Sequence, residues 1–237
     1  MAGPKRLILF VEGEGDSRAV PVLVKQLLTE IQAWEHVSLD PKPLKVGNVA
    51  EVTRENGKKW LRHLHNARKR SNLGGILVVQ DGDLAHIRGE KFCSFHFAAR
   101  LANWSRAAGG GTLFSLASVF ACMEYESWLL PSLDRLAGFP FPDGRPGIRP
   151  GTAPPEGNLE DAPRDAKGWL DKCIDAGYKP TRDQGLLTML AINNLDLIRL
   201  RGLRSFQRLE SALQQLVTAI RTGTHVATPE ISPSPPN

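Results

Sequence analysis

Acidic residues follow two apolar segments of the chain at a spacing that suits a divalent cation. Near the amino terminus, "LILFVEGEGDSR" places Glu12, Glu14 and Asp16 beside two glycines. Further along, "ILVVQDGD" ends in Asp81 and Asp83. Carboxylates this close repel one another unless a cation neutralises them, and without imidazoles or thiols they favour magnesium or manganese over zinc. The sequence therefore predicts a metal site that draws ligands from both segments.

The spacing of Asp81 and Asp83 allows both side chains to bind one ion. Residues two apart in an extended segment face the same side, and Gly82 between them lets the backbone bend around the ion. The same residues also suit an ordinary polar turn, because Asp and Gly are common turn residues. Their position directly after a buried strand favours metal binding.

The acids of the first segment have different expected roles. Glu12 closes an apolar strand and Asp16 lies where the next helix begins, so the two can meet across the turn. Asp16 also suits the N-cap of that helix, since its carboxylate can accept a hydrogen bond from a free amide. Glu14 lies in mid-turn, where exposure to solvent is expected.

A third acidic cluster, "CMEYESWLL", follows a later strand and offers Glu124 and Glu126. Both side chains point one way if the segment is extended, whereas in a helix they diverge by roughly 200° and only one reaches the site. We prefer Glu126 as the additional ligand. The alternative is a solvated helix start, where acidic residues are favourable because of the helix dipole.

Other binding motifs do not fit the sequence. Gly13 and Gly15 begin a G-x-G-x-x-G pattern, but Arg18 occupies the third glycine position and Glu14 would repel a pyrophosphate. No G-K-[ST] follows, which excludes a P-loop. The three cysteines lack a C-x-x-C spacing and the six histidines are scattered, so neither a disulfide framework nor a zinc site is expected.

Strands and helices alternate along the first half of the chain, which predicts an α/β fold with a mostly parallel sheet flanked by helices. Apolar runs predict strands at 6–11, 76–79 and 112–121, and helical spacing predicts helices at 17–34, 52–70 and 92–107. The segment 37–46, interrupted by two prolines, suits an edge strand. In such sheets the active groups gather at the carboxyl ends of the strands, where all the acidic clusters lie.

The length of 237 residues suits one main domain with additions. We expect an α/β core at 1–137, a Pro/Gly-rich excursion at 138–163, a helical extension packed on the core at 164–221 and a flexible tail at 222–237. Within the extension, helices are predicted at 165–176, 183–200 and 205–221. The chain has neither an apolar run that could cross a bilayer nor a signal peptide, so a cytoplasmic protein is expected.

A net charge of +5 favours an anionic partner, although the candidate site is itself acidic. The cations therefore cluster elsewhere, at 58–70 and at 199–208. On the predicted helix "GKKWLRHLHNARKR", six of them can project outward and hold a nucleic-acid backbone: Lys58, Lys59, Arg62, Arg68, Lys69 and Arg70. A solvated helix face is an equal alternative.

The order of the acidic motifs resembles a TOPRIM domain, the fold of topoisomerases and primases that also occurs in the overcoming-lysogenization-defect nucleases. The resemblance covers 6–133 and is carried by Glu12 after the first strand, Asp16 four residues on, and the Asp81 and Asp83 pair. The whole chain, including "MEYESWLL" and "GYKPTRDQG", is similar to an uncharacterised bacterial family of small standalone TOPRIM-like proteins. Members of that family are often encoded near ATPases and are suspected to act in phage defence.

The resemblance implies a TOPRIM-like, Rossmann-like core and a metal-dependent nuclease that cleaves nucleic acid, with DNA favoured over RNA. It implies Glu12, Asp81, Asp83 and Lys179 as catalytic residues, and Glu12, Asp16, Asp81, Asp83 and Glu126 as ligands of one or two Mg²⁺ or Mn²⁺ ions. No Walker motif is present, so an ATPase partner would be a separate protein. With two tyrosines and no room for further domains, topoisomerase activity is not expected.

Two other functions stay open at this point. The chain could be a noncatalytic or conditionally active partner of an ATPase, with the Pro/Gly-rich excursion and 199–208 as docking surfaces. It could also be a phosphotransfer enzyme that acts on a small nucleotide.

Overall fold

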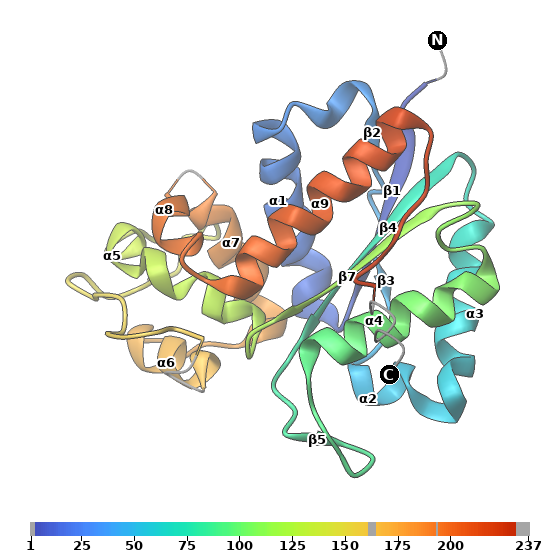
Figure 1. Ribbon diagram of the computed structural model, residues 1–237. Helices are drawn as coiled ribbons and strands as arrows, with labels where there is room; N and C mark the ends of the chain where they lie inside the picture. Colours follow the sequence, from blue (N-terminus) through green and yellow to red (C-terminus); the bar gives the residue numbers. More distant parts are fainter. Residues whose placement is uncertain (1–2, 161–164, 193, 231–237) are drawn as a thin grey trace.

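Three apolar segments form the centre of a parallel β-sheet (Figure 1). The computed structural model describes residues 3–160, 165–192 and 194–230. Strand β1 (Lys5–Val11) pairs with β4 (Leu73–Asp81), and β4 pairs with β7 (Ser115–Ala121), all in parallel. All seven residues of β7 are buried. The continuous apolar runs in the sequence therefore reflect strands covered on both faces, as predicted.

Short strands complete the sheet on both sides. β2 (Val37–Leu39) and β3 (Leu44–Lys45) both pair with β1, which confirms edge strands in the proline-interrupted segment. At the other edge, β8 (Ala227–Thr228) pairs with β7 next to Leu116 and Ala117, so the main order is β2-β1-β4-β7-β8. β5 (His86–Ile87) and β6 (Glu90–Lys91) form a separate antiparallel hairpin.

The presence of β8 contradicts the prediction that the whole of 222–237 is a flexible tail. Ala227 is only 2% exposed, and the amide of Leu116 donates a hydrogen bond of 2.7 Å to the carbonyl of Val226. The segment carries little apolar surface, but its backbone forms hydrogen bonds with the edge of β7. Amino-acid composition does not reveal such backbone pairing. Residues 231–237 of the predicted tail lie outside the described residues.

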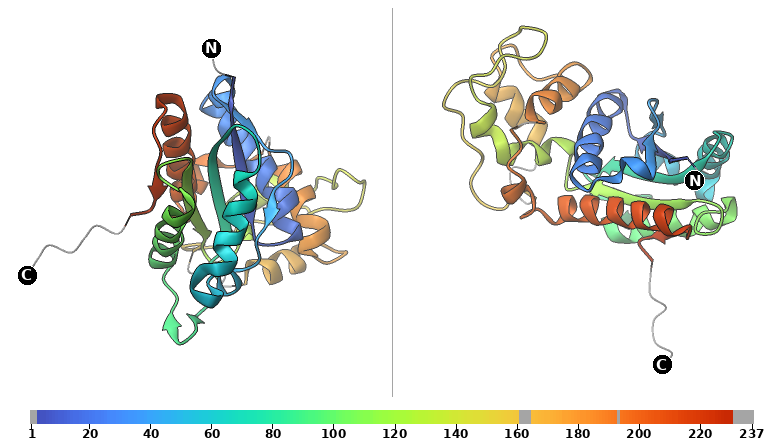
Figure 2. Two further views of the ribbon diagram at one scale, coloured as in Figure 1. Left: turned by 90° about the vertical axis from the view of Figure 1, so that its right-hand side faces the viewer. Right: turned by 90° about the horizontal axis from the view of Figure 1, so that it is seen from above.

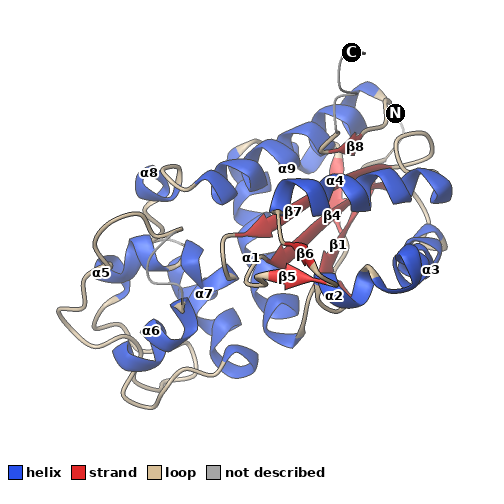
Figure 3. Ribbon diagram, turned by 60° about the horizontal axis from the view of Figure 1, so that its bottom comes forward, coloured by secondary structure: helices blue, strands red, loops and turns tan. Residues whose placement is uncertain are grey.

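Helices cover both faces of the sheet, as expected for an α/β fold. One face packs against α1 (Glu14–Glu30) and α9 (Arg204–Thr222), and the other against α3 (Lys58–Arg68), α4 (Ser94–Ser105) and the short α2 (Val49–Val52). Alternate residues of β1 therefore join different apolar clusters: Leu7 and Leu9 join the first, and Ile8 joins the second. Figure 3 shows α4 and α9 running alongside β7.

Four short helices follow β7 and gather beside α1, at one side of the sheet (Figure 2). They are α5 (Leu133–Leu136), α6 (Ala166–Cys173), α7 (Gly185–Ala191) and α8 (Leu197–Leu200). The predicted helix at 183–200 is not continuous in the structure. A π-helical turn precedes α7, and the Asp196 carboxylate caps a new helix at α8. Their apolar residues belong to the same cluster as α1 and α9, which extends one core. Within the described part of the chain, no helix has the length and apolar content to span a membrane.

A buried ion cluster fixes the turn before α7. Asp183 is fully buried and accepts hydrogen bonds from Arg182 Nε at 2.6 Å, from Arg145 at 2.8 Å and from the Lys179 amide at 2.8 Å. Burial alone would raise the pKa of Asp183, but these donors outweigh it and lower the pKa. The carboxylate therefore stays charged and ties the extension to the loop that carries Arg145.

Replacing Asp183 by alanine is expected to lower the free energy of unfolding by about 3 kcal/mol, because two guanidinium groups lose their buried partner. Urea titration followed by circular dichroism measures the loss. Asp143→Ala is the matched control, since Asp143 also binds Arg145 but is exposed; its loss should be much smaller. Equal losses in the two variants would contradict the assigned role of Asp183.

Candidate metal centre

The carboxyl ends of β1, β4 and β7 meet at one edge of the sheet, and acidic residues follow each of them. The loop after β4 is tied to the loop after β7, because the Gly82 amide donates to the carbonyls of Ala121 at 3.0 Å and Met123 at 2.7 Å. A Cβ atom at position 82 would lie 2.8 Å from the Ala121 carbonyl oxygen. The glycine between Asp81 and Asp83 therefore allows this close approach.

Asp16 is held by contacts from two directions. One carboxylate oxygen accepts a 3.0 Å hydrogen bond from the Gly13 amide, and the other accepts a 2.7 Å bond from Gln184 Nε2. Asp16 was predicted as the N-cap of the helix, but α1 begins at Glu14 with Gly13 as N-cap, so Asp16 caps from the third helical position. A Cβ atom at Gly15 would lie 1.9 Å from Gln184 Oε1, so this glycine lets the extension pack directly against α1.

Asp81 is buried beneath a lysine from the extension. Its Oδ1 accepts a 2.8 Å hydrogen bond from the Tyr125 amide, and its Oδ2 lies 3.1 Å from Lys167 Nζ. The same ammonium group lies 3.0 Å from Glu124 Oε1. Lys167 is on α6, 86 residues from Asp81 in the sequence. Lys167 therefore places a positive charge between two of the acidic clusters.

Glu126, the preferred ligand of the third cluster, is fully buried. Glu124 is extended and Glu126 lies within the 3₁₀ turn Tyr125–Trp128, so the two side chains have different surroundings. The hydroxyl of Tyr178 donates to Glu126 Oε1 at 2.8 Å, whereas Oε2 has no hydrogen-bond partner among the described residues. A buried carboxylate oxygen without a partner is unfavourable, and a cation would satisfy it.

The carboxylates raise one another's pKa. Burial and then the charges of Asp81, Asp16 and Asp83 raise the pKa of Glu12 to about 8. Burial and then the charge of Asp81 raise the pKa of Glu126 to about 8. Burial also raises the pKa of Asp81 to about 7, although Lys167 opposes the shift. These pKa shifts connect all five predicted ligands electrostatically, and near neutral pH they favour the protonated forms of Glu12 and Glu126 when no cation is bound.

Three residues of the sequence analysis lie at the margin of this group. Asp83 is exposed, although its charge acts on Glu12. Glu14 points to solvent and pairs with Lys45 at 2.7 Å, in agreement with its expected exposure. Lys179 is exposed, and its side chain makes no hydrogen bond or ion pair with the described residues. The lysine that contacts the acids is Lys167, which no motif in the sequence indicated.

The donor set fits a hard divalent cation in its chemistry, but the side chains are not arranged around one. Among the described residues, no three His, Cys, Asp or Glu side chains are positioned to hold a metal ion as they stand. The Lys167 ammonium occupies the space between Asp81 and Glu124, and Glu126 Oε2 is left without a partner. Oxygen donors with excess negative charge are those that Mg²⁺ and Mn²⁺ prefer. A metal would bind here after Lys167 moves or alongside it.

The six cations predicted to hold nucleic acid are spread along α3 and its end. Lys59 pairs with Glu51, and Arg70 pairs with Asp40 at 2.6 Å. The other four side chains are exposed: Lys58, Arg62, Arg68 and Lys69. α3 leads into the amino end of the nine-residue β4, which spans roughly 26 Å before Asp81. Lys69 and Arg70 therefore lie toward the edge of the sheet opposite the acidic group.

Comparison with known proteins places the chain in a family. No curated protein and no solved structure matches it. A family model described as "Domain of unknown function (DUF4276)" matches residues 11–214, which include every predicted metal ligand and Lys167. Because the match covers most of the sequence, the chain belongs to the DUF4276 family.

Proposed function

We propose that the protein is a TOPRIM-type nuclease that cleaves nucleic-acid phosphodiester bonds with magnesium or manganese. The observation that carries this proposal is the group of Glu12, Asp16, Asp81, Asp83 and Glu126, in which burial and then neighbouring carboxylate charges raise the pKa values of Glu12, Asp81 and Glu126. Such a group is unfavourable in a folded protein unless a cation offsets it, so it is typical of a functional site. The basic remainder of the chain suits a polyanionic substrate.

The relation to TOPRIM domains is part of the proposal. It is supported by the order of the motifs, with a glutamate after β1 and the D-G-D sequence after the neighbouring strand β4 of a parallel sheet. A role in phage defence and DNA as the substrate follow from the same resemblance. Neither depends on the geometry of the acidic group.

The residues of this chain have separate roles in the proposed reaction. A bound divalent ion would activate a water molecule and offset negative charge on the phosphate. Glu12, Asp81 and Glu126 would hold the ion, while Gln184 orients Asp16 through its 2.7 Å hydrogen bond. Lys167, already within 3.1 Å of Asp81, would stabilise the charge that develops on the phosphate oxygens. This is the role that the sequence resemblance gave to Lys179.

A second candidate function is supported by the position of Lys167. Because its ammonium group lies between Asp81 and Glu124, these two carboxylates are not open to a metal ion in this arrangement. A conditionally active protein would be in this state when alone and would open on assembly with a separate ATPase. The Pro/Gly-rich segment and Arg199 to Arg208 would then provide docking surfaces.

An activity assay tests these proposals together. The purified protein is incubated with plasmid, single-stranded DNA, RNA and small nucleotides, with and without Mg²⁺ or Mn²⁺. We expect metal-dependent cleavage of a polynucleotide, and at least a 100-fold loss of rate in Asp81→Ala with Asp83→Ala, with DNA binding retained. Cleavage of small nucleotides alone would instead indicate the phosphotransfer enzyme.

Two controls make the result decisive. Circular dichroism must show that the double variant is folded. Glu14→Ala removes an acid from the same loop that points to solvent, so its rate should stay close to that of the unmodified protein. If the double variant cleaves at the original rate, Asp81 and Asp83 take no part in catalysis.

A further inference from the structure

A groove follows the outer edge of β7. β8 pairs only with Leu116 and Ala117, and within the described chain no strand pairs with the outer side of residues 118–121. A cavity of about 300 Å³ lies there between α4 and α9, lined by residues of both helices and by Ser118. The two helices lie on opposite faces of the sheet. The groove is thus formed by the unpaired edge of β7 and two helix ends.

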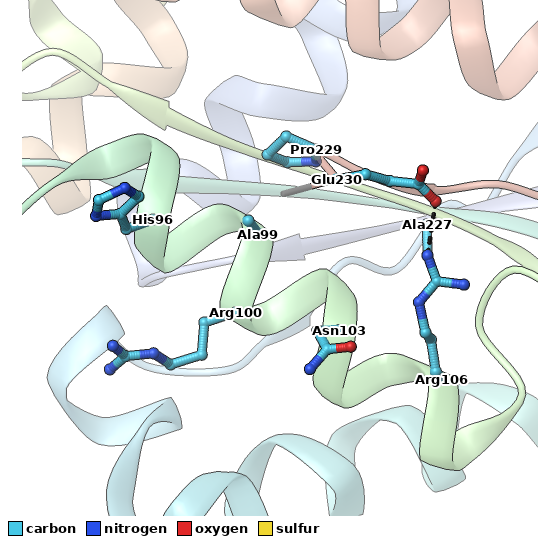
Figure 4. A pocket seen from close by; sticks show the side chains of 8 residues that line it. All are labelled: His96, Ala99, Arg100, Asn103, Arg106, Ala227, Pro229 and Glu230. Carbon is cyan, nitrogen blue, oxygen red and sulfur yellow. Dashed lines mark hydrogen bonds and ion pairs between the residues drawn. The ribbon is translucent and has the colours of Figure 1, made fainter. Parts of the chain in front are cut away.

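The groove is continuous with the acidic loop. A second cavity, of about 590 Å³, is lined by Gly82, which lies between the two aspartates, and shares Ser94 and Cys122 with the first. A third cavity, of about 610 Å³, shares His96 with the second and Pro229 with the first. Figure 4 shows this third cavity, where the side chain of Arg100 projects from α4 and that of Arg106, directly after α4, pairs with Glu230. A bound chain could therefore run from Gly82 along α4.

Two arginines line the first cavity together with Glu160, and neither forms an ion pair among the described residues. Arg204 and Arg208 are one helical turn apart on α9, so they share a face. Arg208 is half-buried and donates a 3.0 Å hydrogen bond to the Thr228 hydroxyl, but no carboxylate among the described residues pairs with it. Burial lowers the pKa of Arg208 because nothing compensates its charge. A guanidinium group in this setting favours an anionic ligand.

A third polar group in the same cavity also lacks a partner. Ser118 is 1% exposed, and its hydroxyl makes no hydrogen bond within the described residues. α4 begins beside it at Ser94, with no side-chain cap on its free amides. One amide in the first turn of α9 already has a partner, because the Ser205 amide donates a 2.6 Å hydrogen bond to Glu160. The arginines, the Ser118 hydroxyl and the start of α4 thus remain for an anion.

An exposed aromatic side chain completes the groove. Phe95, in the first turn of α4, is 49% exposed and lines the cavity with the arginines. Phe92 lines the neighbouring cavity beside Gly82. A cationic groove with aromatic side chains is typical of proteins that bind single-stranded nucleic acid, since phosphates bind the cations and bases stack on the rings. An inorganic anion would make no stacking contact with the phenylalanines.

We propose that this edge groove, formed by Ser94, Phe95, Ser118, Arg204 and Arg208, binds single-stranded nucleic acid and leads it to the acidic group. A backbone phosphate binds Arg204 and Arg208, and a base stacks on Phe95. The groove identifies single-stranded nucleic acid as the substrate of the proposed nuclease, and this part of the inference rests on that proposed function. Binding itself does not depend on cleavage.

Fluorescence anisotropy with a labelled 12-nucleotide oligothymidine, in EDTA to prevent cleavage, tests the proposal. Arg204→Ala with Arg208→Met is expected to weaken binding about tenfold and to reduce the slope of log K against log [salt] by about 1. Methionine keeps an apolar stem at position 208, which protects the fold. The matched control is Arg221→Ala, because Arg221 is an exposed arginine far along the same helix; its affinity should stay within about twofold.

A second measurement locates the strand. A single strand that carries 5-iodouracil should crosslink to Phe95 under ultraviolet light, and Phe95→Ala should remove the crosslink. A duplex of the same sequence should bind more weakly than the single strand. Equal binding of the duplex, or release of the strand by an equal concentration of inorganic phosphate, would overturn the proposal.

The outcomes separate this proposal from the proposed function. If the protein cleaves nothing but the double arginine variant loses affinity for the strand, the groove is confirmed and the nuclease proposal is wrong. If the protein cleaves nucleic acid and the variant binds with unchanged affinity and salt dependence, the groove is wrong and the nuclease proposal is untouched. The circular dichroism spectrum of each variant must match that of the unmodified protein.

Discussion

Glu12→Gln is expected to stabilise the metal-free protein and to remove most of its stabilisation by magnesium. Burial and three neighbouring carboxylates raise the pKa of Glu12 to about 8, so its ionised form is unfavourable in the folded state. Glutamine has the same shape without the charge. Allowing for the partial exposure of Glu12, the gain should be about 1–2 kcal/mol, or roughly 2–8 °C in Tm.

The sign of the effect depends on pH. The pKa of Glu12 is higher in the folded state than in the unfolded chain, so the folded protein binds the proton more tightly. Its contribution to stability is complete below the usual glutamate pKa of 4.5 and is lost as the pH rises toward about 8. The metal-free protein should therefore lose stability across this window, and Glu12→Gln should lose less.

Magnesium is expected to stabilise the folded protein, and to do so more strongly as the pH rises. An ion that binds only the folded state stabilises it by about 2.7 kcal/mol at a concentration 100 times its Kd. The gain should be larger at pH 8 than at pH 6, because the ligands must be ionised to bind the metal. In Glu12→Gln the gain should fall to a small fraction of this value.

Thermal unfolding at pH 6 and pH 8, with EDTA or with Mg²⁺, measures all of these quantities. Glu14→Gln is the matched control, since Glu14 is in the same loop but pairs with Lys45 in solvent, which lowers its pKa. It should show no gain without metal and a normal response to Mg²⁺. A metal-free Glu12→Gln protein that is less stable than the unmodified one would rule out repulsion among these carboxylates.

The elements that the sequence predicted best are those whose signal is local. β1, β4 and β7 are covered on both faces, so each is a continuous apolar run that needs no other part of the chain to be recognised. Acidic residues directly after such runs could be placed at one sheet edge, because parallel strands end together. Asp81 and Glu126 influence one another's charge, as expected for acidic residues that follow neighbouring strands.

The parts that could not be predicted depend on contacts between distant segments. Lys167 reaches Asp81 from α6, and Gln184 reaches Asp16 across 168 positions, yet neither belongs to a recognisable motif. β8 forms because two residues pair with part of the edge of β7, although the composition of the segment is typical of a flexible tail. Lys179 was chosen by resemblance, but its backbone amide binds Asp183 while its side chain is exposed. Only the packing of the extension on the core reveals these partners.

Lys167→Met is expected to reduce cleavage at least 100-fold while magnesium binding is retained or strengthened. The change removes a positive charge that lies 3.1 Å from Asp81 and 3.0 Å from Glu124, so the transition-state phosphate loses its cationic partner. The same change leaves the two carboxylates without a counter-ion. The variant should therefore be less stable than the unmodified protein in EDTA and should recover in Mg²⁺.

Two readouts distinguish this role from a purely structural one. Titration of Tm with Mg²⁺ gives the metal affinity, and an affinity that is retained or raised shows that a loss of cleavage does not come from a loss of the ion. Lys172→Met is the matched control, because Lys172 is exposed on the same helix α6, and its rate and metal affinity should be unchanged. If Lys167→Met is folded in Mg²⁺ and cleaves at the original rate, Lys167 only balances charge. If Lys179→Met alone loses activity, the resemblance identified the catalytic lysine better than the contacts around Asp81 do.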